Sequence, residues 1–478
     1  MAALCGLTLG AVALHGYHPA VEDAEIYLPG ILKQLQPSLF PYNTEFFSSH
    51  AGMTLFPNFM AASIRVTHLS VGTAMLAWQV GSIFLLLWAC LRVARVCFDD
   101  SAAAWCGVAL VAALLTIPVA GTSLYLVDQY VSARTLSTPL SLLAVAAAVE
   151  GRFRSLVAWT LAMALVHPLM TVFTLVYLTV LLADRRDRVP VPEIATALVS
   201  LPVWLFEPAT PAYHRILGTR PLHLITNWRW YEWIGVLLPL LLLMWFSHLA
   251  ARHRFWRMGS MCRSLVFFQL VFCFLAMVIS RPGRFEQLSE LQPMRSLHLL
   301  YILLFVFIGG WLGKVVLHKA TWRWAIVFAP LCFGMWFVQR QLFPATPHIE
   351  WPWTASSNTW VQAFDWIRVN TPTDAYFALD PNYMAIPGED QHGFRAIAQR
   401  STLADAVKDS GAASMFPRLA DEWATQVDAQ RGWKQINRSG FEQLRRRFGV
   451  TWVVLERPGV RGLTCPYANQ LLLVCRIG

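Results

Sequence analysis

Charged residues are scarce in this chain of 478 residues, and their scarcity excludes an ordinary soluble domain. Only 14% of the residues are charged and 56% are hydrophobic, whereas an average soluble domain is about a quarter charged. Long apolar runs recur over the first three quarters of the chain. We therefore predict a mainly α-helical, polytopic membrane protein. Its helices would be embedded in the lipid bilayer, which is an expected partner.

Motifs for nucleotide, hydrolase and redox chemistry are also missing. The sequence has no Walker loop, GxGxxG fingerprint, HExxH motif, nucleophile elbow or CxxC pair. Much of the net charge of +10 falls in short loops between apolar runs, and no basic helix with interleaved aromatics stands out, so nucleic acid is not an expected partner. Seven of the nine cysteines lie in or beside apolar runs. Cys465 and Cys475 instead flank a short loop, where we predict a disulfide if that side is oxidising.

The apolar runs predict about 11 membrane spans, some of them short or broken. Five basic clusters alternate with four less basic loops, and loops rich in Lys and Arg face the cytoplasm. The first run lacks a positively charged start, which disfavours a cleaved signal peptide and leaves a helix that is short for a span. The loops expected outside are 16–65, 122–137, 207–232 and 281–296. The runs lie at about 2–16, 69–91, 102–120, 138–149, 155–166, 168–183, 191–206, 233–250, 264–280, 297–317 and 322–343.

One segment is too short for two complete spans. About 30 residues separate the cytoplasmic anchors at Arg154 and Arg185, whereas two full crossings need about 40. His167 and Pro168 lie at the midpoint, so we predict two short helices that meet there. Because such a break is tolerated at membrane depth only where protein or a water-filled cavity covers it, we expect a cavity on the outer side.

From residue 344 onward the composition becomes that of a soluble domain. Charges of both signs are nearly balanced, and strands are predicted at 374–380, 451–457 and 470–477 with helical stretches between them. We therefore divide the chain into a membrane module, 1–343, and a small α/β domain, 344–478. The last span exits outward by the loop count, which places this domain outside the cytoplasm.

Three carboxylates, Glu22, Asp23 and Glu25, lie close together in the first outer loop, just before an amphipathic segment. One interpretation is helix capping, in which acids satisfy free N–H groups at a helix start. The other is catalytic: Asp23, or else Glu22, acts as the general base that deprotonates a hydroxyl group. Glu25 would then contact the substrate, and Asp23 with Glu25 would suit a hard divalent cation such as Mg²⁺ or Mn²⁺.

Asp128 and Arg134 lie in the second outer loop. They could simply pair to close that loop. Alternatively both flank a substrate beside the acidic loop, because the planar guanidinium of Arg134 binds a phosphate through two parallel hydrogen bonds.

Trp228, Arg229 and Trp230 begin an apolar run. Alternating aromatics at such a position are typical of the interfacial belt of a membrane protein. The alternative is a stacking platform for a sugar or a prenyl chain, with Arg229 near a phosphate.

Arg284 and Arg295 lie in the fourth outer loop, where the positive-inside tendency makes arginine unexpected. They either extend to lipid phosphates at the membrane surface or recognise a lipid-linked phosphate or pyrophosphate.

Several segments resemble one known group of membrane enzymes. The acidic first loop, the many spans and the outer C-terminal domain are together similar to the GT-C superfamily, which are integral-membrane glycosyltransferases that use polyprenyl-phosphate sugars. The detailed match is with an uncharacterised bacterial branch of multi-pass proteins. The acidic pair of the superfamily falls on Glu22 and Asp23, in the order Glu-Asp rather than Asp-x-Asp. The segments are HPAVEDAEIYLPGI, LFPYNTEFF, DQYVSARTLSTPL, LVHPLM, WRWYEWIG and LQPMRSLHLLY.

The resemblance implies transfer of a sugar from a polyprenyl-phosphate donor to a glycan, lipid or protein acceptor. The reaction would take place at the outer face of the bacterial cytoplasmic membrane. Asp23 or Glu22 would activate the acceptor hydroxyl, and Arg134 and Arg295 would hold the leaving phosphate. A non-catalytic alternative is that the same architecture binds, flips or scaffolds a lipid-linked glycan during envelope assembly.

Overall fold

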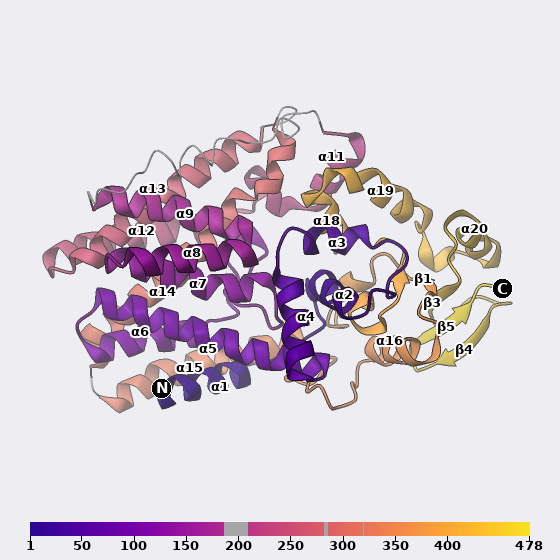
Figure 1. Ribbon diagram of the computed structural model, residues 1–478, viewed down its shortest axis with the longest axis horizontal. Coiled ribbons are helices and arrows are strands. Elements are labelled where there is room, and N and C mark those ends of the chain that lie inside the picture. Colours follow the sequence, from indigo (N-terminus) through magenta and orange to yellow (C-terminus); the bar gives the residue numbers. More distant parts are fainter. Residues whose placement is uncertain (186–208, 282–284, 319) are drawn as a thin grey trace.

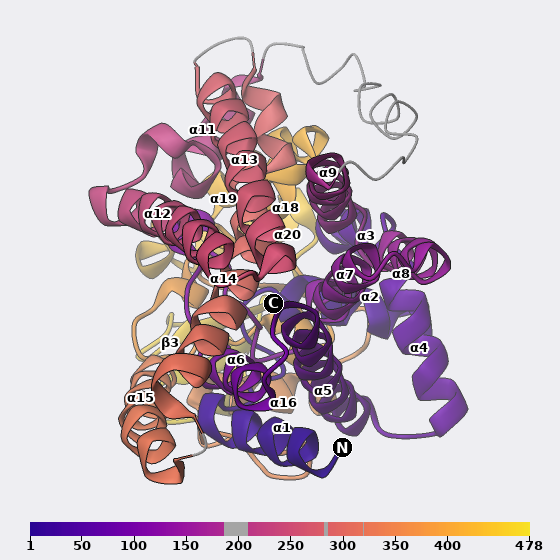
Figure 2. The same cartoon turned by 90° about the vertical axis from the view of Figure 1, so that its left-hand side faces the viewer.

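The computed structural model describes residues 1–185, 209–281, 285–318 and 320–478. Its apolar helices lie lengthwise in a bundle, and the C-terminal domain (residues 344–478) lies at one end of that bundle (Figure 1). Seen along the bundle, α1 (Ala2–His15) lies beside α5 (Val71–Cys97) and α15 (Thr321–Leu342) (Figure 2). This arrangement confirms a mainly helical fold that carries a small C-terminal sheet domain.

Five helical segments are long and apolar enough to cross a membrane by length and composition. Five shorter apolar helices accompany them, and the predicted run at 191–206 lies outside the described residues. The described residues therefore support several spans but do not confirm the predicted number. The long segments are α5, α12 (Trp230–Arg252), α13 (Trp256–Ile279), the continuous stretch Glu286–Leu317 that contains α14 (Leu297–Leu312), and α15; the shorter helices are α1, α6 (Ser101–Ala113), α7 (Ala133–Val149), α8 (Phe153–Val166) and α9 (Pro168–Asp184).

The predicted break at His167 is confirmed. Helix α8 ends at Val166 and α9 begins at Pro168, because His167 adopts φ −153° and ψ 88°. Proline suits the first position of the new helix, where no N–H donor is needed. His167 is buried and lies within electrostatic range of Arg134 and Arg295, so the break lies in the neighbourhood of these two arginines.

The predicted cytoplasmic loops meet at the end of the bundle far from the C-terminal domain. Arg92 bonds Glu150 at 2.7 Å, and Arg263 bonds Asp184 at 2.9 Å. Lys314 lies 4.0 Å from the ring centroid of Phe255. Loops predicted to share one side of the membrane thus lie together, while the side itself stays a prediction.

The predicted outer loops meet at the opposite end. The first of them forms three helices, α2 (Ala24–Leu35), α3 (Glu45–Ala51) and α4 (Phe56–Thr67), which lie between the bundle and the C-terminal domain (Figure 1). The third forms α11 (Pro211–Thr219), whose Tyr213 hydroxyl donates to the Ser414 carbonyl of the C-terminal domain at 3.0 Å.

The C-terminal domain is an α/β unit with a five-stranded sheet in the order β2-β1-β3-β5-β4. Strand β1 is parallel to β2 and β3, whereas β5 is antiparallel to β3 and β4. The three predicted strands are present as β1, β3 and β5. Two further strands are not predicted by the sequence pattern: β2, which has two residues, and β4, whose Pro466 is typical of an edge strand. The elements are α16 (Thr359–Asn370), β1 (Tyr376–Ala378), α17 (Phe394–Ala398), β2 (Ser401–Thr402), α18 (Asp409–Met415), α19 (Ala420–Ala429), α20 (Arg438–Phe448), β3 (Trp452–Glu456), β4 (Thr464–Ala468) and β5 (Leu472–Arg476).

Apolar cores join the loops of the bundle to the C-terminal domain. Ala20 of the first loop belongs to the core that contains Trp360 and Phe364. Phe46 of α3 and Tyr213 of α11 share another core with residues of α18 and α19. Because burial of apolar area stabilises each contact at roughly 25 cal/mol per Å², the two parts hold one another in place. The predicted disulfide between Cys465 and Cys475 is present and links β4 to β5.

Candidate functional site

The acidic turn before α2 is held in an unusual backbone conformation. Glu22 has a φ of 55°, in the left-handed region that residues other than glycine rarely adopt and that is often found at functional sites. Asp23 occupies the N-cap position of α2, yet its side chain makes no capping hydrogen bond. The helix-capping interpretation is therefore wrong for Asp23. Instead its backbone N–H donates to the Tyr130 hydroxyl oxygen at 3.3 Å, which ties the turn to the second loop.

Both carboxylates face Lys408, which directly precedes α18. The Lys408 ammonium contacts Oε2 of Glu22 and lies 3.1 Å from Oδ1 of Asp23. Lys408 is buried, whereas the side chains of Glu22 and Asp23 are 31% and 33% exposed. The acids are therefore oriented by the lysine and keep an accessible surface for a ligand.

Two arginines singled out from the sequence lie in the electrostatic neighbourhood of Asp23. Arg134, in the first turn of α7, is buried and donates to Oδ2 of Asp128 at 2.7 Å. The loop-closing pair is thus present, and Arg134 also acts on the Asp23 carboxylate. Arg295 acts on the same carboxylate, and its buried Nε has no hydrogen-bond partner within the described ranges. Arg295 is therefore the cation with spare hydrogen-bonding capacity for an anionic ligand.

These charges determine the protonation of the acidic turn. Burial alone would raise the pKa of Asp23, but attraction from Lys408, Arg134 and Arg295 lowers that pKa below its ordinary value. Burial would lower the pKa of Lys408, but Asp23 and Glu22 raise it. Asp23 is therefore ionised and Lys408 protonated at neutral pH.

Glu25 points away from the other two acids and joins the first loop to α17. Its buried carboxylate accepts hydrogen bonds from the backbone N–H groups of Arg395 and Ala396, both at 2.9 Å. The Arg395 side chain lies 3.4 Å from Glu25 and bonds both carboxylate oxygens of Asp409. Burial raises the pKa of Glu25, while Arg395 and the two N–H groups act in the opposite direction. These contacts give Glu25 a structural role at the junction.

The side chains of the described residues do not form a metal site. Within the described parts of the chain, no three His, Cys, Asp or Glu residues are grouped so that they could hold a metal ion. The oxygens of Glu25 are engaged by N–H donors, and Asp23 contacts Lys408. A divalent cation shared by Asp23 and Glu25 stays a prediction.

A hollow of about 560 Å³, which we call the inner hollow, opens between the bundle loops and the C-terminal domain. Trp228 and Arg229 line it, as do Arg220 and Ser410. Arg220 donates from Nε to the Ser410 hydroxyl at 3.0 Å and from Nη2 to the Val407 carbonyl. Val407 and Ser410 flank Lys408 in the chain, so the inner hollow lies next to the lysine that orients the acidic turn.

Trp230 is not among the residues that line this hollow. Trp230 is 74% exposed and packs edge-to-face against Tyr231, as expected of an interfacial aromatic. Arg284 lies outside the described residues.

The sequence pattern does not predict a role for Lys408 or Arg220. Lys408 is 385 residues away from Asp23 in the chain, and no local motif surrounds it. Lysine occurs at only five positions of the sequence, and this rarity is the one signal that could have drawn attention to Lys408.

Comparison with known proteins identifies no family for this chain. No family model matches the sequence, and no curated protein matches it. Two structures of an oligosaccharyltransferase from Archaeoglobus fulgidus, one apo and one tethered to an acceptor peptide containing an NVT sequon, are similar to the chain in structure. Each match covers 95% of this chain with a TM-score of 0.49; the apo match has 12% identity and covers 69% of that chain, and the other has 11% and covers 68%. A TM-score below 0.5 gives this similarity no weight for function.

Proposed function

We propose that this chain is an integral-membrane glycosyltransferase of the GT-C type. It would transfer a sugar from a polyprenyl phosphate to an acceptor at the outer face of the bacterial cytoplasmic membrane. The observation that carries the proposal is the meeting of two partly exposed carboxylates, Glu22 and Asp23, with cations from three separate segments, Arg134, Arg295 and Lys408. Anionic and cationic groups are both required, because an acceptor hydroxyl must be oriented while a phosphate departs.

The reaction would form a bond between the acceptor oxygen and the anomeric carbon of the donor sugar. The bond between that carbon and the phosphate oxygen breaks, and polyprenyl phosphate leaves with the electron pair. Arg295, whose Nε is free of partners among the described residues, would bind the leaving phosphate as its negative charge develops. Arg134 would contribute positive charge from its fixed position against Asp128.

Asp23 would accept a hydrogen bond from the acceptor hydroxyl. Its lowered pKa makes it a weak base, so its main contribution is to orient the attacking oxygen while remaining ionised. The proton then leaves with the phosphate, whose second pKa is about 6. Glu22 would assist from the neighbouring position, and the acceptor hydroxyl would replace the 3.1 Å contact between Lys408 and Asp23.

The test is a transfer assay with the full chain reconstituted in liposomes. A panel of undecaprenyl-phosphate-linked hexoses serves as donor, and release of undecaprenyl phosphate is measured by mass spectrometry. Asp23→Asn and Glu22→Gln are expected to lower the rate by about 100-fold or more. Arg446→Met, which changes an exposed cation on α20, is the control. Unchanged turnover in both acidic variants would remove the acidic turn from the mechanism.

The same assay addresses the divalent cation. If a cation bridges the acidic turn and the donor phosphate, EDTA is expected to abolish turnover. Readdition of Mg²⁺ or Mn²⁺ is then expected to restore it. If EDTA does not change the rate, the positive charge that stabilises the leaving phosphate would come from Lys408, Arg134 and Arg295 alone.

A further inference from the structure

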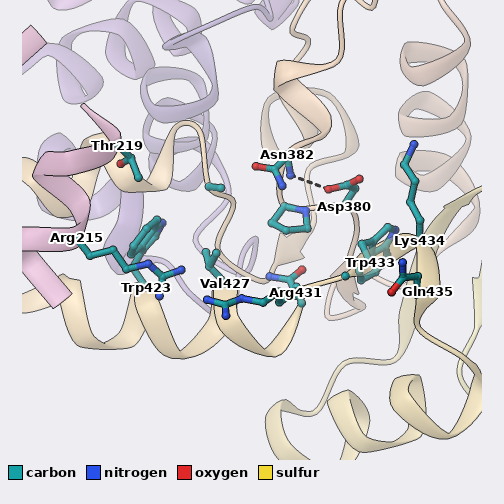
Figure 3. Close-up of a pocket in the computed structure, with 14 residues that line it drawn as sticks. Arg215, Thr219, Asp380, Asn382, Trp423, Val427, Arg431, Trp433, Lys434 and Gln435 are labelled. Carbon is teal, nitrogen blue, oxygen red and sulfur yellow. Dashed lines mark hydrogen bonds between the residues drawn. The ribbon is translucent and has the colours of Figure 1, made fainter. Parts of the chain in front are cut away.

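A second hollow, of about 410 Å³, lies between α11 of the third outer loop and the C-terminal domain, beside α19; we call it the outer hollow. Figure 3 shows Asp380 and Asn382 on one side of it and Arg431 on the other, with Arg215 towards one end and Gln435 towards the other. Neither the acidic turn nor the arginines of the proposed reaction line it. The proposed reaction therefore gives the outer hollow no role.

The outer hollow lies at the carboxyl edge of the parallel strands, where ligands of open α/β sheets usually bind. Asp380 follows β1 by two residues, and Ala406 lies in the loop after β2. Lys434, a third lining residue, bonds Glu456 at the end of β3 at 3.0 Å. The loops after β1 and β2 thus contribute to one concave surface, and Lys434 ties that surface to the end of β3.

The cations around the outer hollow are already paired with carboxylates. Arg215 and Arg431 both bond Asp428, at 2.8 and 2.9 Å, and Lys434 bonds Glu456. A phosphate or another anion would have to compete with these carboxylates. The electrostatics therefore favour a neutral ligand.

The remaining polar groups suit a ligand that is rich in hydroxyl groups. Asn382 and Gln435 are exposed, and their side-chain amides, which offer both donors and acceptors, make no hydrogen bond within the described chain. The Asp380 carboxylate accepts from the Asn382 backbone N–H through one oxygen, which leaves the second oxygen for a ligand. Trp433 adds an aromatic wall at the same end.

The outer hollow adjoins the inner hollow. Thr219 and Ala406 line both, so the two hollows are neighbours. A chain of sugar units held in the outer hollow would have its end close to the inner one.

We propose that the outer hollow is a saccharide-binding site that holds a neutral segment of an acceptor glycan. The proposal rests on the proposed glycosyl transfer, and it names the acceptor class as carbohydrate. The amides of Asn382 and Gln435 and the carboxylate of Asp380 bind the sugar hydroxyls, while the end of the glycan reaches the inner hollow.

Binding is tested without turnover on the detergent-solubilised full chain. Saturation-transfer NMR is recorded with mannotriose, maltotriose and chitotriose, and inorganic phosphate is the competing anion. The double variant Asn382→Ala/Gln435→Ala removes two exposed side chains that make no intramolecular hydrogen bond in the described structure, so the fold is expected to survive. Gln443→Ala, an exposed residue on α20 outside the hollow, is the matched control.

At least one trisaccharide is expected to bind the wild type and the Gln443 variant, and to bind the double variant about tenfold more weakly. The proposal is overturned if no trisaccharide binds, if the double variant binds equally well, or if phosphate displaces the sugar. Donor cleavage is measured on the same samples. Sugar binding without donor cleavage would support this site and contradict the transferase, whereas cleavage without sugar binding would do the reverse.

Discussion

At the scale of single residues, the chemistry centres on Asp23 and its lysine. A carboxylate whose pKa lies below its ordinary value is a poor proton acceptor but a dependable hydrogen-bond acceptor. Lys408 helps to produce this state, and it orients Glu22 at the same time. The pair is formed by residues of the first loop and of the C-terminal domain, so the site is complete only when the two parts are joined.

Replacing Lys408 by methionine is expected to raise the pKa of Asp23, because its largest attractive partner is lost. Because Asp23 acts in its ionised form, the rate falls at low pH. This fall, the acid limb of the pH–rate profile, should move to higher pH in Lys408→Met. Undecaprenyl phosphate release measured between pH 4 and pH 8 provides the profile. Arg446→Met should leave the acid limb in place, and an unmoved limb in Lys408→Met would contradict the assigned role of Asp23.

At the scale of elements, one carboxylate fastens three segments together. Glu350, in the segment after α15, accepts from His18 Nδ1 at 2.6 Å and from His392 Nε2 at 3.1 Å. His18 follows α1 and His392 precedes α17, and both histidines are buried. Burial would raise the pKa of Glu350, but His392 and His18 lower it to about 2. This contact helps to hold the C-terminal domain on the bundle.

Because the Glu350 pKa is depressed in the folded state, its stabilising effect is lost as the pH falls from about 4.5 towards 2. Glu350→Gln should lower the free energy of unfolding by about 3 kcal/mol at pH 5, and by less at pH 3. Thermal unfolding of both proteins in detergent at pH 7, 5, 4 and 3 measures the difference. Glu442→Gln, at an exposed pair on α20, should have a small effect. A difference that is constant over this pH range would contradict the assignment.

The packing of α6 against α14 depends on glycine. A Cβ atom on Gly309 would lie 2.6 Å from the Cys106 carbonyl oxygen and 2.7 Å from Cα of Gly107. Small residues allow such close approach between helices in membranes. Gly309→Ala should therefore lower the free energy of unfolding by about 1–3 kcal/mol. In α15, Gly334→Ala meets nothing within 4 Å and should be neutral or slightly stabilising. Equal melting temperatures for the two variants would show that α6 and α14 are not this tightly packed.

At the scale of the whole molecule, the two ends of the bundle differ in chemistry. One end joins basic loops through pairs such as Arg92 with Glu150, and the other carries the candidate site and the disulfide-bonded domain. A disulfide is typical of an oxidising compartment, and basic loops are typical of the cytoplasmic side. Together these features favour a membrane orientation with the C-terminal domain outside.

Single cysteines placed at the two ends should report this orientation. In a background with Cys5→Ser, which removes the exposed free cysteine, Gln443→Cys on α20 should react with an impermeant maleimide on intact cells. Arg154→Cys, exposed at the start of α8, should react only after permeabilisation. The opposite pattern would invert the topology and place the candidate site in the cytoplasm.

The sequence by itself determined the helical membrane class, the break at His167, the small α/β domain and the disulfide. These features depend on local hydrophobicity, on proline geometry and on short-range spacing, all of which can be read from neighbouring residues. The tertiary structure alone decided that Lys408 faces Glu22 and Asp23, and that Glu25 serves the junction through Arg395. Such contacts join charges hundreds of residues apart, because the fold buries them together, and no local pattern encodes which acid will meet which base.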